Sequence, residues 1–387
     1  MPAGPAYLDR LLAALRAALA GQVPAVLASS NTPAPGDGSR PSPEPDPTVP
    51  DDVALVVATS GSTGEPRAVM LSAAALRASA AATDARLGGP AQWMLALPPD
   101  HIAGLQVLVR SILAGTDPIA AAPGPFRPDA FAADAARLTG PRQYVSLVPT
   151  QLHRLLDDAG AGLAALTRFD AVLLGGAATS PALLARARTA GLAVRTTYGM
   201  SETCGGCVYD GVPLDGVRVR LEDDGRVLLA GPMLATGYLG RPDLDAEAFT
   251  AEPPAGGGTR WLRTSDVGEL AGGRLTVLGR IDDVLVTGGA KVSPAAVERV
   301  VAELDGVGEV CVVGLPDAEW GQAVTAVVVM AAGRTAPTLA AVRSLVTRNL
   351  GAPAAPRHLV VLDRLPVRGP GKTDRRAVAE LAAARLT

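Results

Sequence analysis

Apolar and polar positions along this chain predict strands and helices in turn. Segments of helical length, rich in Ala, Leu and Arg, separate short apolar runs of the kind found in central strands. The apolar runs begin at Val53, Trp93, Tyr144, Ala171 and Leu192. The helical segments cover residues 72–87, 102–115, 150–159 and 181–190. This alternation predicts a layered α/β fold with a largely parallel sheet.

The two ends of the chain depart from that pattern. Leucines at helical spacing predict an amphipathic helix over residues 6–19, and seven prolines between Pro33 and Pro50 predict an extended linker. After Tyr209, glycine-punctuated strands predict β-hairpins. From Ile281 a smaller unit is predicted, with helices at 294–304 and 338–350 and strands at 307–314, 323–330 and 357–362.

These patterns predict three parts of the chain. Residues 1–50 form an N-terminal helix and a Pro-rich linker. Residues 51–280 form a large layered α/β domain with a β-hairpin-rich subdomain. Residues 281–387 form a small C-terminal α+β domain.

Composition excludes several classes of protein. The chain has 387 residues, and its 35 Lys+Arg against 38 Asp+Glu give a net charge of −3, which argues against a nucleic-acid-binding protein. No apolar run reaches the roughly 18 residues of a membrane span, and the first residues lack the apolar stretch of a signal peptide. Three cysteines are too few for a disulfide framework and suit a reducing compartment. We therefore expect a cytoplasmic protein with no nucleic-acid or membrane partner.

Arginine supplies nearly all of the positive charge. Only Lys291 and Lys372 are lysines among the 35 basic residues. The two residue types are not interchangeable, because lysine carries a compact point charge on a flexible stem. Both lysines are therefore candidates for positions where chemistry needs that group.

Residues 59–67 read Thr-Ser-Gly-Ser-Thr-Gly-Glu-Pro-Arg directly after an apolar strand. Glycine backbone amides can curl around an anion, and the Ser and Thr hydroxyls add donors to phosphate oxygens. The spacing differs from that of the Walker loop. We predict a phosphate-binding loop formed by Thr59, Ser60, Gly61, Ser62, Thr63, Gly64 and Arg67.

A second candidate segment runs from residue 197 to residue 203. The Tyr198 ring offers an apolar face for a base, and the Ser201 hydroxyl can donate to a phosphate. The Glu202 carboxylate is a hard oxygen ligand for Mg²⁺. Gly199 and Met200 lie between these side chains.

Residues 59–67 resemble the phosphate-binding signature of the adenylate-forming superfamily, which includes acyl-CoA and aryl-CoA ligases, luciferases and peptide-synthetase adenylation domains. Further matches follow in the family's order as far as Arg376. The resemblance implies ATP, Mg²⁺ and coenzyme A as cofactors, a small-molecule carboxylic acid as substrate and a mobile C-terminal domain. The family usually has lysine where this chain has Arg67.

The resemblance also assigns roles around the nucleotide. In the family, the positions of Tyr198, Ser201 and Glu202 stack on adenine, touch the α-phosphate and hold the metal. The other matches are Gly175 in the acyl pocket, Gly176 and Ala177 in the adenine pocket, Asp266 on the ribose, and Arg280 on ribose and phosphate.

Two further matches concern domain motion. Asp282 matches the family's hinge, although a turn residue would look the same in sequence. Lys372 matches the lysine that reaches the substrate carboxylate and the α-phosphate during adenylation, and a solvated basic tail is the alternative. Lys291 lies in a stretch that the family swings toward the site for thioester formation, and a salt bridge is an equal alternative.

The acid pocket has less specific candidates. His101 lies between a strand end and a helix start, where ligands of α/β proteins gather, and it either faces the acyl pocket or caps the helix. Candidates for the distal carboxylate of a dicarboxylate are Ser146, Thr150, Gln151 and Gln106. Cys204 and Cys207 have CxxC spacing, but no second ligand pair accompanies them, so we expect no zinc site.

Four segments together resemble the o-succinylbenzoate–CoA ligases of menaquinone biosynthesis, especially the actinobacterial ones. They are residues 97–111, 145–156, 173–178 and 196–217. The alternatives are another aryl- or acyl-CoA ligase, an adenylating enzyme that loads a carrier protein, and an inactive homologue that binds nucleotide. The chain is shorter than these relatives before Thr59, and a homodimer could cover the exposed front edge of the sheet.

Overall fold

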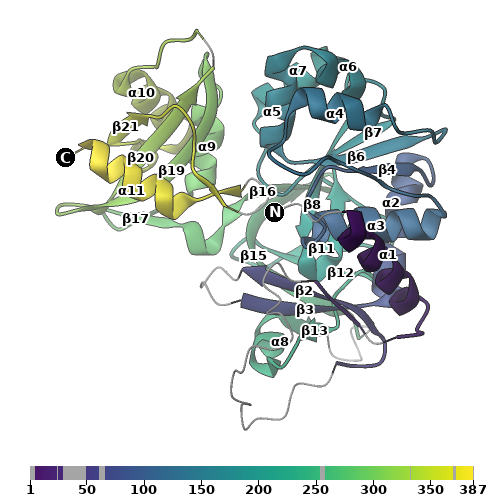
Figure 1. Ribbon diagram of the computed structural model, residues 1–387. Helices are drawn as coiled ribbons and strands as arrows, with labels where there is room; N and C mark the ends of the chain where they lie inside the picture. The colour runs from purple at the N-terminus through teal and green to yellow at the C-terminus, as the bar shows by residue number, and fades with distance from the viewer. Residues whose placement is uncertain are drawn as a thin grey trace, which may run out of the picture. The chain divides into compact units, whose positions relative to one another are not determined.

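The computed structural model describes residues 5–23, 25–28, 49–60, 66–252, 258–331, 333–368 and 372–386 (Figure 1). The predicted linker lies almost wholly outside the described residues. The chain divides into two units. One consists of Met1–Gly175, Gly191–Arg220 and Leu228–Thr264, and the other of Gly176–Ala190, Leu221–Val227 and Ser265–Thr387. The mixed α/β architecture confirms the predicted fold class, whereas the domain boundaries at residues 50 and 280 stay predictions.

A seven-stranded sheet forms the centre of the first unit, with the strand order β10-β9-β8-β7-β6-β4-β5. Neighbouring strands from β5 to β8 are parallel, and β9 and β10 add antiparallel at one edge. The strands are β4 (Gln92–Leu95), β5 (Ile119–Ala120), β6 (Gln143–Leu147), β7 (Ala171–Leu174), β8 (Val194–Met200), β9 (Gly205–Tyr209) and β10 (Val212–Pro213).

The first apolar run belongs to a second, four-stranded sheet. Strand β2 (Val53–Ser60) pairs antiparallel with β3 (Pro66–Ser72) and parallel with β1 (Val26–Ala28). Strand β13 (Gly237–Tyr238) pairs antiparallel with β3. Only residues 61–65 connect β2 to β3, and a parallel crossover needs about a dozen residues or more. The short connection therefore requires a hairpin at this position.

Helices pack around these sheets and bury the apolar core of the first unit. The predicted helices are confirmed as α1 (Pro5–Leu19), α2 (Ala73–Leu87), α3 (Ile102–Ala114) and α5 (Pro149–Asp158), with α4 (Pro128–Ala135) and α6 (Ala161–Leu166) in addition. Leu11 and Leu15 of α1 are buried in the same cluster as Leu55 and Leu71 of β2 and β3. In the described part of the chain, every helix is too short or too polar to span a bilayer.

The second unit contains a β-hairpin and a small sheet. Strand β15 (Arg260–Ala271), which belongs to this unit from Ser265 onward, pairs antiparallel with β16 (Arg274–Arg280) on either side of Gly272 and Gly273. The register of this hairpin shifts between Val267 and Gly268. The sheet has the order β18-β17-β20-β19, and β21 also pairs with β20. Its strands are β17 (Leu285–Thr287), β18 (Ala290–Val292), β19 (Val307–Asp317), β20 (Gly321–Met330) and β21 (His358–Val361).

This small sheet has an apolar layer on both faces. Val312 and Val328 belong to one buried cluster with α9 (Pro294–Val301) and α10 (Leu339–Leu350). Cys311 and Val327 belong to another with α11 (Arg375–Leu386). Alternate residues of β19 and β20 therefore serve opposite faces. Figure 1 shows α11, in yellow, running along the sheet.

Candidate functional site

The predicted phosphate loop joins the ends of β2 and β3 in the first unit. Thr59 is the register partner of Arg67, and the Thr59 hydroxyl donates to the Arg67 carbonyl oxygen over 3.3 Å. Gly61, Ser62, Thr63 and Gly64 lie outside the described residues, as does the side chain of Ser60. The described residues therefore define where the loop leaves and re-enters the hairpin.

Arg67, Tyr238 and Glu202 form a chain of contacts from three separate segments. The Tyr238 hydroxyl donates to Glu202 Oε1 over 2.7 Å. Arg67 Cζ lies 5.9 Å from the centroid of the Tyr238 ring, within cation–π range. Burial and the Glu202 carboxylate raise the pKa of Tyr238, so the phenol stays a hydrogen-bond donor. One oxygen of the predicted metal ligand is therefore held by a buried tyrosine.

The backbone around Tyr238 is bound on two sides. Gly237 and Tyr238 pair with Met70 and Val69 of β3. Asp245 Oδ1 accepts the Tyr238 amide over 2.7 Å, and a Cβ on Gly237 would overlap that carboxylate. Tyr238 is not among the site residues predicted from the sequence. The available signal was its place after a glycine, in a chain with only five tyrosines.

Ser201 and Glu202 lie in the 3₁₀ turn η1 (Ser201–Thr203), directly after β8. Thr203 Oγ1 accepts the Met200 amide over 2.9 Å and donates to the Gly205 carbonyl over 2.7 Å. These bonds cap the turn locally, because they join residues close in sequence. Thr203 therefore fixes the turn that carries the two predicted phosphate and metal contacts.

Close strand approach requires glycine at two predicted site positions. A Cβ on Gly199 would overlap the Gly205 carbonyl oxygen, and a Cβ on Gly175 would overlap Thr197 Oγ1. Neither clash could be relieved without moving a strand or turning a threonine. Gly176 and Ala177 belong to the second unit, where both are exposed and Gly176 has a φ of 81°.

The acid-pocket candidates have different surroundings. His101 occupies the N-cap position of α3, but its side chain makes no capping hydrogen bond there. Ser146 is buried in β6. Gln151 has a structural role, because its amide binds the Val148 amide and the Ala96 carbonyl at 3.0 and 2.9 Å. His101, Ser146, Thr150 and Gln106 stay candidates for the pocket.

Gln106 is buried, and its Nε2 donates to the Cys204 carbonyl over 2.7 Å. Its Oε1 has no hydrogen-bond partner among the described residues. Cys204 and Cys207 are buried free thiols, and burial raises the pKa of Cys207 to about 12. No group of three His, Cys, Asp or Glu side chains comes together in the described ranges.

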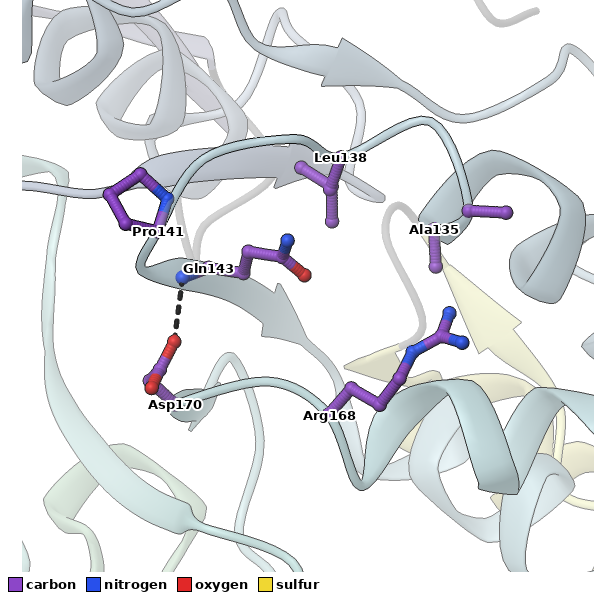
Figure 2. Close-up of a pocket in the computed structure, with 7 residues that line it drawn as sticks. Ala135, Leu138, Pro141, Gln143, Arg168 and Asp170 are labelled. Carbon is purple, nitrogen blue, oxygen red and sulfur yellow. Dashed lines mark hydrogen bonds between the residues drawn. The ribbon is translucent and has the colours of Figure 1, made fainter.

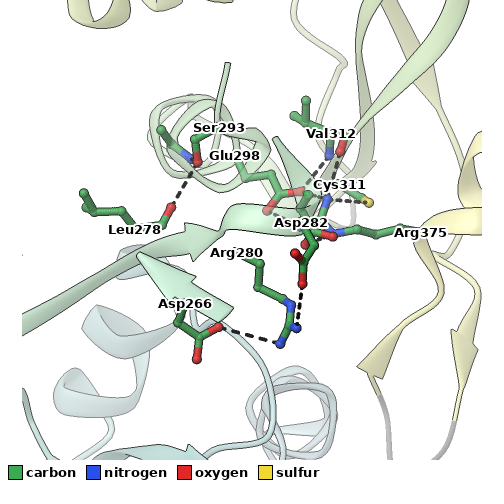
Figure 3. Close-up of polar contacts among 11 residues, drawn as sticks. Asp266, Leu278, Arg280, Asp282, Ser293, Glu298, Cys311, Val312 and Arg375 are labelled. Atoms are coloured by element: carbon green, nitrogen blue, oxygen red, sulfur yellow. Dashed lines mark hydrogen bonds and ion pairs between the residues drawn. The ribbon is translucent and has the colours of Figure 1, made fainter. Parts of the chain in front are cut away.

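Three predicted residues of the second unit lie together (Figure 3). Asp266 and Arg280 are register partners across the hairpin, with Asp266 Oδ1 3.8 Å from Arg280 Nη1. Arg280 Nη2 also lies 3.3 Å from Asp282 Oδ2 in the turn η3 (Ile281–Asp283). The predicted ribose contacts and the predicted hinge are thus joined through one guanidinium.

Lys372 lies in β23 (Lys372–Thr373), which pairs antiparallel with β22 (Val367–Arg368). Lys372 is the register partner of Arg368. Residues 369–371 and the Lys372 side chain are outside the described part of the chain. The structure therefore gives the backbone position of the predicted catalytic lysine within the second unit.

Figure 2 shows a hollow in the first unit, into which Arg168 and Gln143 extend. Its volume is about 430 Å³. It lies near the amino ends of β6 and β7, where the Gln143 amide donates to Asp170 Oδ2 over 2.8 Å. Ligands of open α/β sheets bind beyond the carboxyl ends of the strands. None of the predicted site residues lines this hollow, so we do not place the active site there.

Residues 9–239 match the AMP-binding enzyme family, and residues 296–372 match the AMP-binding enzyme C-terminal domain. The chain therefore belongs to the AMP-binding enzyme family. This family membership covers the hairpin at Arg67, the turn at Glu202 and the segment that ends at Lys372.

Individual proteins and solved structures are also similar to this chain. A Mycobacterium tuberculosis protein named "Probable 2-succinylbenzoate–CoA ligase" is 48% identical over 332 residues, which are 85% of this chain and 84% of that protein. The solved o-succinylbenzoate CoA synthetase MenE from Bacillus subtilis, in complex with the acyl-adenylate intermediate OSB-AMP, is 28% identical. Its TM-score is 0.68 over 84% of this chain and 70% of that one. The amide bond synthetase McbA from Marinactinospora thermotolerans is 29% identical, with a TM-score of 0.73 over 86% and 70%.

Proposed function

We propose that this chain is an ATP-dependent carboxylate–CoA ligase whose acid substrate is o-succinylbenzoate. The observation that carries the proposal is the 48% identity to the Mycobacterium tuberculosis ligase over 85% of the chain. In the first step the carboxylate attacks the α-phosphate of ATP, which forms the acyl adenylate and releases pyrophosphate. In the second step the coenzyme A thiolate attacks the acyl carbon, which forms the thioester and releases AMP.

In this proposal most contacts to ATP and the acid come from residues between Thr59 and Ser201. Tyr198 stacks on adenine beside Gly199 and Met200, and Ser201 donates to the α-phosphate. The phosphate contacts come from Thr59, Ser60, Gly61, Ser62, Thr63, Gly64 and Arg67. His101, Ser146 and Gly175 line the acid pocket.

The proposed ribose contacts and the mobile cation come mostly from later in the sequence. Asp266 and Arg280, which lie opposite each other in the hairpin, bind the ribose, and Gly176 and Ala177 border the adenine. Lys372 stabilises the charge that develops at the substrate carboxylate and α-phosphate during adenylation. Rotation of the C-terminal domain at Asp282 then withdraws Lys372 and opens the way for coenzyme A.

Glu202 fits a Mg²⁺ ion that is bound through substrate phosphates and water. Mg²⁺ is usually held by one or two carboxylates plus phosphates. Glu202 is one carboxylate at a fixed position, with Tyr238 on its Oε1, and no cluster of three ligands surrounds it among the described residues. When bound, Mg²⁺ would neutralise phosphate charge. The part of Glu202 is to present an oxygen, and the part of Tyr238 is to hold that carboxylate in place.

The test is pyrophosphate release from ATP with o-succinylbenzoate, benzoate and medium-chain fatty acids, each with and without coenzyme A. We expect kcat/KM for o-succinylbenzoate to exceed that for the other acids by about 10²-fold, since a site built for a second carboxylate rejects acids that lack one. A higher kcat/KM with another acid would show that o-succinylbenzoate is not the preferred substrate. Pyrophosphate release that coenzyme A does not stimulate, with no acyl-CoA formed, would indicate a carrier-protein-loading enzyme. No turnover at all would refute ligase activity.

A further inference from the structure

Arg375 joins four segments of the second unit through one guanidinium (Figure 3). Its Nη1 and Nη2 donate to the two oxygens of Glu298 on α9, over 2.7 and 3.0 Å. Nη1 also donates to the Val312 carbonyl of β19 over 2.8 Å. Its Nε lies 3.6 Å from Asp283 Oδ2 in η3. Arg375 itself is the first residue of α11.

The Glu298 pair is the rigid part of this network. The Glu298 side chain is only 14% exposed, and its Oε1 also accepts the Val312 amide over 2.7 Å. Burial alone would lower the pKa of Arg375, but the Glu298 carboxylate outweighs burial and raises it. The arrangement needs the planar fork of arginine, because a lysine ammonium cannot bind both carboxylate oxygens in parallel.

Only two residues separate Lys372 from Arg375, and the backbone of both is hydrogen-bonded. Lys372 and Thr373 form β23, and the next amide, that of Asp374, donates to the Pro366 carbonyl over 2.9 Å. Asp374 Oδ1 then accepts the Ala377 amide over 3.2 Å at the start of α11. The backbone from the two-stranded ribbon into the helix is therefore bound throughout, and fixing Arg375 fixes the base of the ribbon.

The two adjacent carboxylates of η3 form ion pairs with different segments of the second unit. Asp282 pairs with Arg280, which precedes the turn, at 3.3 Å. Asp283 pairs with Arg375, which lies far along the chain, at 3.6 Å. The turn at the predicted hinge thus has one ion pair to β16 and one ion pair to α11.

We propose that Arg375 is a positioning residue that makes η3, α9 and the Lys372 ribbon move as one body. This inference rests on the proposed roles of Asp282 and Lys372. A rotation at Asp282 then moves Lys372 by a defined amount, because the Asp283 pair and the Glu298 pair carry the movement to the ribbon. Without those pairs the hinge can turn while the ribbon lags behind.

Two substitutions separate the contacts. Asp283→Asn removes the charge that faces the hinge and leaves the Glu298 pair, whereas Arg375→Lys keeps the charge and loses the fork. We expect adenylation, measured as pyrophosphate exchange, to slow about threefold in Asp283→Asn and about tenfold in Arg375→Lys. Thioester formation from preformed acyl adenylate should change less than about twofold. The control is Arg376→Gln, a side chain that is 91% exposed beside Glu380 and whose loss should change neither rate.

Two further measurements complete the test. In a Lys372→Ala background neither variant should slow adenylation further, because the group being positioned is absent. Hydrogen exchange at the amides of Thr373 and Asp374 should speed up at least about threefold in Arg375→Lys and stay unchanged in Arg376→Gln, whether or not the enzyme is active. Equal slowing of both half-reactions, or unchanged exchange, would overturn the positioning role. A wild-type chain that adenylates no acid would instead refute the proposed function.

Discussion

The Tyr238 hydroxyl binds Glu202 Oε1 at 2.7 Å, so the predicted metal-binding carboxylate has a buried neutral donor on one oxygen. The two residues are 36 positions apart in sequence. The bond fixes the direction of the carboxylate, and the ring carries Arg67 on its face. Substitution of Tyr238 should therefore affect the Mg²⁺ dependence of the reaction more than the stability of the fold.

Tyr238→Phe should raise the Mg²⁺ concentration needed for half-maximal adenylation by about tenfold. A hydrogen bond to a charged group contributes roughly 1.5–3 kcal/mol, and its loss frees the carboxylate to rotate. The control is Tyr209→Phe, which removes an equally buried hydroxyl that binds Thr83 Oγ1 at 3.1 Å. A Mg²⁺ titration of pyrophosphate release measures both. An identical Mg²⁺ dependence in the two variants would contradict the role of Tyr238.

Arg67→Lys should keep adenylation within about threefold, whereas Arg67→Gln should lower it about 10²-fold. The lysine keeps a cation beside the Tyr238 ring and next to the loop, and the glutamine keeps neither charge nor cation–π attraction. The measurement is KM for ATP together with kcat in both variants. Full activity of the glutamine variant would remove Arg67 from the phosphate site.

Gly175→Ala should destabilise the first unit by about 2–3 kcal/mol, because the added Cβ meets Thr197 Oγ1. Thr197→Ala takes that oxygen away. The double variant should therefore recover most of the lost stability, and the free energy of unfolding in urea measures this. If the double variant were no more stable than Gly175→Ala alone, the clash would not be with the threonine.

Lys372→Ala should slow adenylation by about 10²–10³-fold, the range found when a preorganised charge is removed from a transition state. Thioester formation from preformed acyl adenylate should change less than about threefold, since the lysine is withdrawn in that step. Rapid-quench measurement of each half-reaction gives the two rates. Equal losses in both would contradict the domain-rotation assignment.

All three cysteine thiols should be unreactive toward thiol reagents in the folded protein and reactive in the unfolded protein. Each is buried and free, and burial raises the pKa of Cys207 and of Cys311 to about 12. Thiol titration with Ellman's reagent at pH 8 should find none in native protein and three in guanidinium chloride. A thiol counted in the native state would contradict this burial.

The same thiols predict how stability depends on pH. An unfolded thiol releases its proton near pH 8.5, whereas the folded one keeps its proton to a higher pH. Above that pH the folded state therefore binds more protons than the unfolded state does. The contribution of the thiols to the free energy of unfolding, which is fully present below that pH, is lost as pH rises. Between pH 8 and 9.5 the free energy of unfolding should fall by at least about 1 kcal/mol. A rise over this range would contradict the direction of the shifts.

Strong periodicity made much of the fold predictable. The apolar faces of α1, α5 and α10 and the short buried strands follow directly from the sequence pattern, because burial imposes their spacing. Helix α11 was not predicted, since its residues are mostly Ala and Arg and only Val378 and Ala382 are buried. Helix α6 has only six residues, too few for a periodic signal.

The candidate site was only partly predictable for a different reason. Glu202 and Arg67 lie in local motifs whose chemistry can be read along the chain. Tyr238 and Arg375 act through partners far away in sequence, with Arg375 lying 77 positions from Glu298. No local pattern reports such contacts, because they arise from strand register and helix packing.

The register shift in the β15–β16 hairpin decides which residue lies opposite Asp266. A regular ladder closed by Gly272 and Gly273 would pair Asp266 with Gly279, which has no side chain. The shift leaves Leu278 without a register partner and brings Arg280 opposite Asp266 instead. The freed Leu278 carbonyl accepts the hydroxyl of Ser293, the residue that caps α9. A single surplus residue in one strand thus creates the Asp266–Arg280 pair and also attaches the hairpin to the first helix of the small sheet.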